Sequence, residues 1–527
     1  MGDGITTNSA MTDVLIVGAG PTGLTLACDL ARRGIACRVL ERAERPSTAS
    51  RAKTIQPRAL EVADDLGVID RVLALGAVRI PTRQYDRDRV VSEAVEAAVG
   101  IAAPDVPYAP VWLSQPLFEQ ILRDRFAELG GRVEMGATVA ALAQDDEGVA
   151  ATVHTATGGT HQIRARYVVG CDGGRSPVRQ QIGATLQGTS LPGQSWHLGD
   201  VRVQGLERGR QHLWMSPGHG ILSLFPLPST DIWQFQASVP ADPTEPEQPS
   251  LELFRRIFTE RAGVPGVTIT DADWLSLYKI NVCLVDRYRV GRVFLAGDAA
   301  HIHSPAGGQG MNTGIQDAYN LGWKLAAVLE GASPALLDTY EHERRPVAQA
   351  VLRDSTSRLH AVMRAAGTGD GSSAQRDLTG DFTTGLTISY PDSPLSHHTP
   401  PHRGILRPGD RAPDANCLHA ATGEPVRLFD LQRGPHWTLL SFTDGTSTSH
   451  PARAQAHVPL RTHQISADTA ATGPDTVIDT EGDAYRAYGA GGDEFVLIRP
   501  DGYIAARFPR EAHDAALRQA TSLAATA

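Results

Sequence analysis

Residues 13–42 read DVLIVGAGPTGLTLACDLARRGIACRVLER: a buried strand, a glycine-rich turn, a helix and a second strand in succession. Gly18 permits the tight turn, Gly20 lets the backbone approach a pyrophosphate, and Gly23 lets helix and strand pack closely. The phosphates would lie at a helix N-terminus, where free N–H groups and the helix dipole favour anions. Glu41 ends the second strand, where a carboxylate can accept from ribose hydroxyls. The stretch predicts a dinucleotide site and leaves open which dinucleotide is bound.

Length and composition bound the class of protein. The 527 residues suffice for two or three domains, and 41% hydrophobic with 20% charged residues is typical of a soluble globular protein. The net charge of −10 gives no basic face for nucleic acid. The sequence has neither an apolar run of about 18 residues nor a signal-peptide core. We expect no nucleic-acid or membrane partner and a cytoplasmic location.

Thiol and imidazole groups give no metal or disulfide pattern. His301 and His303 lie two residues apart with no third ligand nearby, so no metal site is predicted. The cysteines show no CxxC spacing and are predicted to be reduced packing residues; they are Cys28, Cys37, Cys171, Cys283 and Cys417.

Two later turns repeat the arrangement of a strand followed by an acid. Asp172–Gly173 follows one buried strand, and Gly297–Asp298 follows another. A glycine-rich loop over 304–314 then leads into a long helix through Leu329, whose N-terminus can stabilise negative charge on an aromatic ring system. The basic loop 50–58 can reach phosphates or face solvent, and its residues leave both open.

In order and spacing, the segments GAGPTG with Glu41–Arg42, GCDGGRSPVR, and GRVFLAGDAAHIHSPAGGQGMNTGIQDAYNLGWKLA resemble the group A flavoprotein aromatic monooxygenases of the p-hydroxybenzoate hydroxylase type. The chain is most similar to members with an added C-terminal thioredoxin-like domain, such as phenol hydroxylase and the aromatic polyketide hydroxylases of secondary metabolism. The resemblance covers residues 12–360 and, more loosely, 408–527.

The resemblance implies an α/β fold in which a Rossmann-like FAD-binding domain is interleaved with a β-sheet substrate domain. The expected divisions are a disordered tail at 1–10, the FAD-binding domain at 11–80, 110–184 and 281–365, the substrate-binding sheet at 81–109 and 185–280, a linker at 366–405, and the thioredoxin-like domain at 406–527. Because Cys417 has no second thiol nearby, we expect packing or subunit contact rather than redox exchange from the last domain.

The resemblance also implies the cofactor, FAD, with NADPH or NADH as a transient reductant. Glu41 would bind the adenosine ribose, Asp298 the ribityl and pyrophosphate region, and the glycine loop the isoalloxazine. The implied cofactor-binding residues are Gly18, Gly20, Thr22, Gly23, Glu41, Arg42, Arg51, Gln115, Asp172, Gly173, Gly297, Asp298, Pro305, Gly308, Gly310, Met311 and Asn312.

The implied reaction is monooxygenation of a phenolic, hydroxy-heteroaromatic or polyketide ring. In this family reduced flavin and O2 form a C4a-hydroperoxide, whose distal oxygen is attacked by an electron-rich ring carbon. No protein nucleophile is needed, so no catalytic residue is assigned. Baeyer–Villiger oxidation, epoxidation and antibiotic inactivation remain alternatives with the same cofactor, and a non-catalytic flavin protein is a distant one. Homo-oligomer formation is left open.

The substrate pocket is expected in 185–280, where aromatic side chains can serve either as sheet core or as ligand wall. Tyr278 falls where related enzymes place a substrate-contacting tyrosine. Lys53 stands where phenol hydroxylase-like members carry an acid, and can stabilise a phenolate or point to solvent. The remaining pocket-wall candidates are His212, Trp214, Phe225, Trp233 and Phe235.

Overall fold

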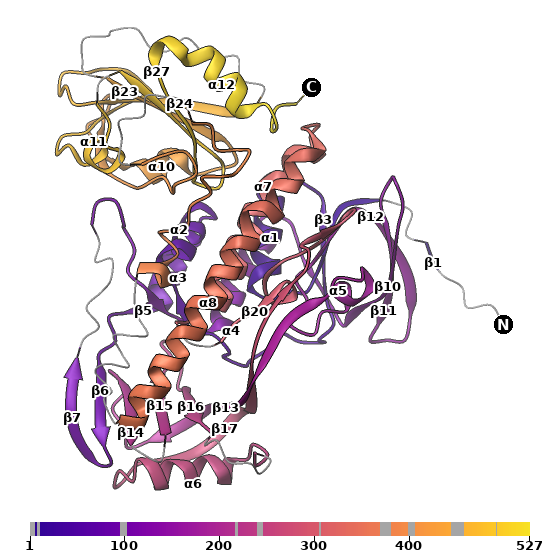
Figure 1. Cartoon of the computed structure of the whole chain (residues 1–527), viewed down its shortest axis with the longest axis vertical. Helices are drawn as coiled ribbons and strands as arrows, with labels where there is room; N and C mark the ends of the chain where they lie inside the picture. The colour runs from indigo at the N-terminus through magenta and orange to yellow at the C-terminus, as the bar shows by residue number, and fades with distance from the viewer. Residues whose placement is uncertain are drawn as a thin grey trace.

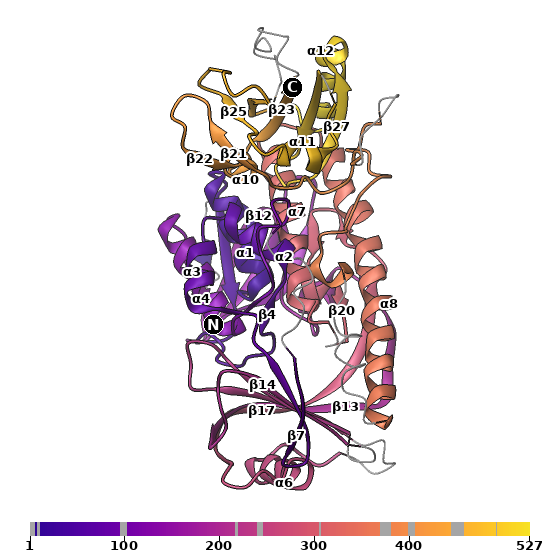
Figure 2. The same cartoon turned by 90° about the vertical axis from the view of Figure 1, so that its left-hand side faces the viewer.

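The computed structural model describes residues 6–7, 11–94, 103–216, 220–239, 246–304, 307–368, 381–398, 406–443, 458–491 and 493–526. Within these residues the strands form one sheet of nine strands, one of eight, one of seven and a small one of three. Figures 1 and 2 show the three large sheets as three tiers, with the seven-stranded sheet at the top and the eight-stranded sheet at the bottom.

The middle tier is built on parallel strands buried on both faces, which explains their continuous aliphatic runs. The central strand β12 pairs in parallel with β2 on one side and β19 on the other, and β2 pairs in parallel with β3. The nine strands are β1 (Thr6–Thr7), β2 (Thr12–Val17), β3 (Cys37–Glu41), β9 (Val133–Met135), β10 (Ala137–Gln144), β11 (Val149–Thr155), β12 (Thr160–Gly170), β18 (Arg289–Val290) and β19 (Val293–Leu295).

Several helices pack around this sheet. The longer ones are α1 (Pro21–Arg32), α2 (Pro57–Asp65), α4 (Gln115–Glu128), α7 (Gly310–Leu329) and α8 (Asp338–Thr368). The shorter ones are α3 (Ile69–Leu75), α5 (Pro177–Gln181), η1 (Gly297–Ala299) and η2 (Pro334–Leu337). A small sheet of β4 (Thr54–Ile55), β8 (Val111–Trp112) and β5 (Ala77–Val78) lies beside them.

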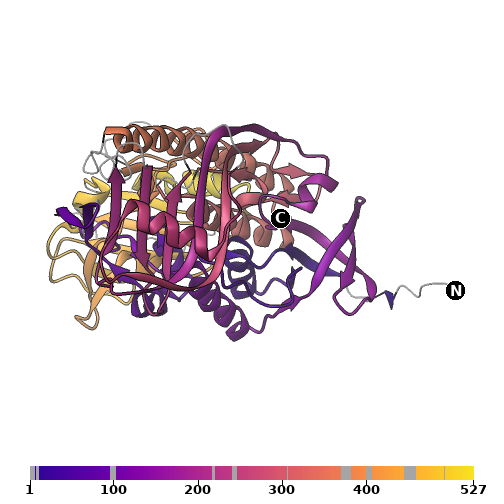
Figure 3. The same cartoon turned by 90° about the horizontal axis from the view of Figure 1, so that it is seen from below.

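The bottom tier is a largely antiparallel sheet whose order is β20-β17-β13-β16-β15-β14-β6-β7. Helix α6 (Leu251–Arg261), predicted from the sequence with these bounds, covers its outer face (Figure 3). The strands are β6 (Thr82–Asp86), β7 (Arg89–Ala94), β13 (Leu186–Gln204), β14 (Gln211–Ser216), β15 (Gly220–Pro226), β16 (Trp233–Ser238), β17 (Thr268–Val285) and β20 (His301–Ile302).

The top tier is a mixed sheet in which β23, β24 and β25 are parallel and β26 and β27 run antiparallel to their neighbours. Its strands are β21 (Asn416–His419), β22 (Pro425–Arg427), β23 (Trp437–Thr443), β24 (Leu460–Ser466), β25 (Thr476–Ile478), β26 (Glu494–Ile498) and β27 (Ile504–Pro509). The accompanying helices are α10 (Leu428–Gln432), α11 (Asp483–Tyr488), η4 (Arg510–Ala512) and α12 (His513–Thr521). Cys417 is buried in this domain, and all five cysteines are free thiols.

Long helix α8 connects the tiers. It contacts α7 in the middle tier and β14, β15 and β17 in the bottom tier (Figure 1). Its distal part contributes Leu359 and Val362 to an apolar cluster on the inner face of the bottom sheet, opposite α6.

Two segments differ from the sequence-based expectation. Within the tail expected to be disordered, Thr6–Thr7 form β1 and pair in parallel with β12; the rest of 1–10 lies outside the described residues. Within the expected linker, residues 381–398 begin with η3 (Asp381–Thr384) and bury Ile388, Tyr390 and Leu395 against the neighbouring domains. These apolar side chains are widely spaced among polar residues, which is why composition suggested an open linker.

Candidate functional site

Three loops meet at the carboxyl edge of the parallel strands. Val17 of β2 pairs with Gly170 of β12, and Gly170 pairs with Leu295 of β19. The residues that follow these strand ends are the Gly18 turn, Cys171–Asp172 and Ala296–Gly297. Ligands of open α/β sheets bind at this edge.

Glycines are required here by close backbone contacts. A Cβ on Gly18, whose φ is +105°, would lie 2.4 Å from the Cys171 carbonyl oxygen. A Cβ on Gly23 would lie 2.0 Å from the Gly18 oxygen. Thr22 is enclosed by the same packing, because a Cβ on Gly297 would lie 2.5 Å from its Oγ1. Thr22, Gly23 and Gly297 therefore fix the loops against each other.

Other glycines of the site border open space. A Cβ on Gly20, on Gly173 or on Gly310 would meet no described atom within 4 Å. Gly20 is the N-cap of α1, and Gly310 is the first residue of α7. Helix N-termini that border open space can bind an extended anionic dinucleotide such as FAD.

Two carboxylates line the same edge. Asp172 accepts a hydrogen bond from Val178 N at 3.0 Å through Oδ2, while its buried Oδ1 has no partner among the described residues. Burial raises the pKa of Asp172. Asp298 is exposed, yet enough protein surrounds it for burial to raise its pKa, against the opposing charges of His301 and Arg51. Both carboxyl groups can therefore accept hydrogen bonds from hydroxyl groups of FAD. Asp172 can do so through Oδ1, and Asp298 can do so because its side chain is exposed.

Glu41 supports the first turn directly. Its Oε2 accepts from Ala19 N at 3.0 Å, and its Oε1 accepts from Ala43 N at 3.0 Å. Each carboxylate oxygen keeps a further lone pair for a ribose hydroxyl. Arg42 is exposed at the end of this strand.

Gln115 and Arg51 lie where α4 begins. Gln115 Oε1 accepts from Ala52 N at 3.2 Å, and its Nε2 donates to Glu119 Oε1 at 2.8 Å. The exposed Arg51 guanidinium is close enough to Asp298 and Glu119 to oppose the pKa rise of both carboxyls. The structure thus brings Gln115, Arg51 and Asp298 to one side of the site.

The loop before α7 is fixed by Asn312. Its Oδ1 accepts from Gln56 N at 2.8 Å, and its Nδ2 donates to the oxygens of Thr54 at 3.0 Å and Gly308 at 2.7 Å. Met311 is half-buried beside the main core. Pro305, also expected at the cofactor, lies outside the described residues.

A buried polar chain holds the Asp298 loop from below. His301 Nδ1 lies 2.6 Å from His303 Nε2, and His301 Nε2 lies 2.6 Å from Asp317 Oδ2. Asp317 also accepts from Gly297 N at 3.1 Å and from Arg344 Nε at 2.7 Å. Burial opposes ionisation of Asp317, but His301 and Arg344 keep its pKa low. Sequence motifs did not identify Asp317 or Arg344 as parts of the site. The signal that could have found them is a charged residue at a helix position that faces the core.

The aromatic pocket candidates divide between the two faces of the bottom sheet. Trp214, Trp233 and Phe235 are fully buried with α6 in the outer core. His212 is also fully buried; its Nδ1 lies 2.7 Å from Tyr85 Oη, and its ring stacks near Trp214. These four side chains therefore point away from the middle tier and fill the domain's own core, as alternation along each strand requires.

Tyr278, Phe225 and Lys53 lie at the boundary between the bottom and middle tiers. Tyr278 Oη donates to the His303 carbonyl at 3.2 Å, and burial, with a smaller effect from Asp298, raises its pKa to about 12. The Lys53 Nζ lies 3.8 Å from the centroid of the Phe225 ring. The structure places these three side chains on the side of the sheet opposite α6.

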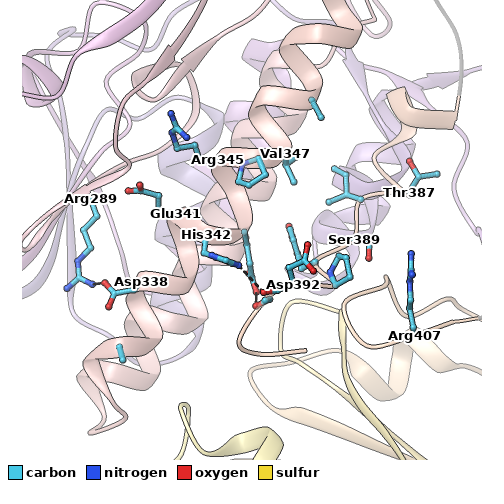
Figure 4. A pocket seen from close by; sticks show the side chains of 18 of the residues that line it. Arg289, Asp338, Glu341, His342, Arg345, Val347, Thr387, Ser389, Asp392 and Arg407 are labelled. Carbon is cyan, nitrogen blue, oxygen red and sulfur yellow. Dashed lines mark hydrogen bonds and ion pairs between the residues drawn. The ribbon is translucent and has the colours of Figure 1, made fainter. Parts of the chain in front are cut away.

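A groove of about 1240 Å³ lies elsewhere, between α8 and residues 387–393 (Figure 4). Arg289 and Asp338 stand on one side, and Arg407 on the other. No residue lining it belongs to the three converging loops. In the described parts of the chain, no helix is long and apolar enough to cross a membrane, and no three His, Cys, Asp or Glu side chains are grouped to bind a metal ion.

Comparison with known proteins agrees with this geometry. Residues 11–355 match the FAD binding domain family, and residues 406–525 match the aromatic-ring hydroxylase C-terminal family. A flavin-dependent monooxygenase of Mycobacteroides abscessus is 40% identical over 500 residues, covering 93% of this chain and 96% of the relative. The 6-methylpretetramide 4-monooxygenase of Streptomyces rimosus is 34% identical over 525 residues, covering 94% and 91%.

The structure of aklavinone-11 hydroxylase with FAD and aklavinone is similar at a TM-score of 0.81 and 28% identity, covering 97% of this chain and 99% of that one. The agreement extends over all three tiers, including the C-terminal domain. The chain belongs to the FAD-dependent aromatic-ring monooxygenases.

Proposed function

We propose that this enzyme hydroxylates a phenolic ring of a polycyclic, polyketide-type substrate, with NADPH or NADH as the reductant. The observation that carries the proposal is the hydrogen bond from Tyr278 to His303. It joins the inner face of the bottom sheet to the segment that leads into the glycine loop. A flat substrate on that face would lie next to the redox-active ring of FAD.

The cofactor residues follow from the three converging loops. The Gly18–Gly20 turn and the N-terminus of α1 would hold the pyrophosphate, with Glu41 at the ribose. Asp298 would bind the ribityl–pyrophosphate region. Bound FAD supplies the exchange of electrons with the nicotinamide and the activation of O2.

The loop around Asn312 would hold the flavin ring, with Gly308, Gly310 and Met311 beside it. Asn312 is already fixed by three hydrogen bonds, so the backbone facing the ring is organised before the cofactor binds. Ordered backbone at the N-terminus of α7 would favour negative charge on the reduced ring. Protein around the bound ring would exclude water, which would limit unproductive loss of the activated oxygen.

The substrate class is supported by similarity at full length. The relatives that act on 6-methylpretetramide and aklavinone match more than nine-tenths of this chain, C-terminal domain included. Both names denote polycyclic substrates, and this supports a substrate of that shape for the present chain. Hydroxylation of a fused-ring phenol is therefore favoured over Baeyer–Villiger oxidation or epoxidation.

The test is substrate-stimulated turnover of the FAD-loaded enzyme. NADPH and NADH oxidation is followed with a panel of hydroxyanthraquinones, hydroxynaphthacenes, naphthols and simple phenols, and products are analysed by mass. We expect at least one fused-ring phenol to accelerate oxidation and to gain one oxygen atom. Acceleration by none of them, or peroxide release with no change in aromatic mass, would contradict the proposal.

A further inference from the structure

Loop 50–56 is hydrogen-bonded at one end to the bottom sheet and at the other end to the N-terminal end of α7. At its start, Ser50 N donates to Asp200 Oδ2 of the bottom sheet at 2.6 Å. At its end, Gln56 N donates to Asn312 Oδ1 at the N-terminal end of α7 at 2.8 Å. The loop therefore spans the boundary between the sheet and the glycine loop, and its middle residues have a defined position there.

Lys53 is the cation in the middle of this loop. Its carbonyl accepts from Leu113 N at 2.9 Å, which fixes its backbone. Its Nζ lies 3.8 Å from the centroid of the Phe225 ring and 5.9 Å from that of Trp112. The two ring centroids are 5.5 Å apart, and both side chains are buried. An ammonium group on an aromatic face is held by cation–π attraction, so Lys53 has a preferred position.

The sheet beside this aromatic pair is polar. Gln234 is the strand neighbour of Phe225, and Gln236 is the neighbour of Ser223. Gln236 Nε2 donates to Gln234 Oε1 at 2.7 Å, and Gln234 donates to the Ser50 carbonyl. On this face Gln236 is half-buried, and its amide can bind a keto or hydroxyl group of a flat ligand, whereas the buried Gln234 connects Gln236 to the loop.

We propose that Lys53, held on Phe225 and Trp112, is a specificity-determining residue that selects aromatic substrates carrying an ionised oxygen. The inference rests on the proposed function and names its substrate class: a fused-ring phenol bound as the phenolate. A cation within about 4–6 Å of such an oxygen favours its ionised form. The negative charge spreads into the ring and makes the ring carbons better nucleophiles. The aromatic pair holds the ammonium group in place, and Lys53 supplies the charge.

The experiment measures binding and ionisation of a coloured probe, 1,2-dihydroxyanthraquinone, whose anion absorbs beyond the flavin band. It is titrated into FAD-loaded wild type, Lys53→Met and Lys53→Arg at a fixed pH below the pKa of the free probe. The 2-methyl ether of the probe, which cannot ionise at that oxygen, is titrated in parallel. Lys279→Met is the matched control, because Lys279 is exposed on β17.

We expect wild type to bind the probe with a visible anion band. Lys53→Met should lose the band and bind the probe about tenfold or more weakly, the effect of removing one nearby charge at a half-buried site. Lys53→Arg should keep most of the band, and Lys279→Met all of it. Binding of the methyl ether should change less than twofold in every variant.

The proposal is overturned if wild type binds no anion, or if Lys53→Met binds the anion as wild type does. A lower melting temperature with an unchanged anion band would show that Lys53 only fastens the loop. The proposed function is judged separately. If the anion band depends on Lys53 but no oxygenated product forms, only the proposed hydroxylation is contradicted. If oxygenated product forms but the anion band does not depend on Lys53, only the proposed role of Lys53 is contradicted.

Discussion

Replacing Glu343 by glutamine should loosen the C-terminal domain from the FAD-binding domain. Glu343 of α8 is buried and accepts from Lys324 Nζ at 2.7 Å, from Asn320 Nδ2 at 2.7 Å, and from Arg499 Nη1 of the C-terminal domain at 2.6 Å. Asp501 also accepts from Arg499, at 2.6 Å. Burial opposes ionisation of Glu343, but Arg499 and Lys324 overcome it and keep the pKa of this carboxyl low.

The size of the effect follows from what the two cations can do. Breaking a buried ion pair costs about 3–5 kcal/mol. Burial lowers the pKa of Lys324 to about 8. At pH 7, one unit below this value, the lysine can lose its proton when Glu343 is replaced, so its contribution to the loss of stability is at most about 1.4 kcal/mol. Arg499 cannot lose its proton and keeps only Asp501. We therefore expect a loss near the lower limit, about 3 kcal/mol at pH 7.

The contribution of Lys324 to this loss of stability also depends on pH. In wild type Lys324 loses its proton near pH 8, and in Glu343→Gln it does so at lower pH because its anion is gone. Once both are neutral, the lysine no longer distinguishes the two proteins. The difference in unfolding free energy should therefore narrow by about 1.4 kcal/mol between pH 7 and pH 9.

Tryptophan fluorescence during urea unfolding reports on this interface. Trp323 of α7 and Trp437 of β23 lie edge to face across it, with ring centroids 5.7 Å apart. The first fluorescence transition should shift to lower urea in Glu343→Gln. Glu330→Gln, at an exposed position just after α7, should stay within about 0.5 kcal/mol of wild type. A shift worth less than about 1 kcal/mol at pH 7, or one that does not narrow by pH 9, would refute the reasoning.

Four further variants test the site. Asp298→Ala should weaken FAD retention about tenfold or more through loss of a charge-assisted hydrogen bond. Gly20→Val, which fills open space, should do the same without lowering the melting temperature of the FAD-free protein; parent-level retention in both, measured by flavin absorbance after gel filtration, would exclude them from the cofactor site. Tyr278→Phe should keep FAD but give less product per NAD(P)H, and unchanged coupling would remove Tyr278 from the pocket. Burial raises the pKa of Asp200 to about 6, so folding favours its protonated form, and the contribution of this residue to stability falls by about 3 kcal/mol as pH rises from about 4 to 6. Asp200→Asn should lack this contribution, so the difference in stability between wild type and variant, measured in thermal melts, should change over this pH range. A difference that stays constant from pH 4 to 6 would contradict the raised pKa of Asp200.

The cofactor side of the site follows from local sequence. Each of its loops begins where an aliphatic run stops at a glycine or an acid, as at Gly18, Asp172 and Asp298. Parallel strands end at one edge of their sheet, so three such signals predict one shared site without knowledge of the distances between them. FAD chemistry was predicted from these motifs, and the family comparison confirms it.

The substrate side does not follow from local sequence in the same way. Alternation in β14, β15 and β16 divides residues into two faces, but residue type does not say which face is inward, because Trp214 and Phe225 are equally suited to a core or to a ligand wall. The choice is made by α6, whose Phe254 and Phe258 cover the face with Trp214. Only the packing of a helix from a later segment identifies Phe225 as inward.

Loop 50–56 shows the same dependence on distant residues. Its two fastening bonds join residues 150 and 256 positions apart, Ser50 with Asp200 and Gln56 with Asn312. No pattern within the loop sequence predicts these two partners, although their hydrogen bonds determine the position of Lys53. Because the cofactor motifs are local and the loop's position is not, the proposed role of Lys53 predicts that changes at Asp200 or Phe225 alter substrate choice while every cofactor motif stays intact. Substrate range in such a fold can therefore change without loss of FAD binding.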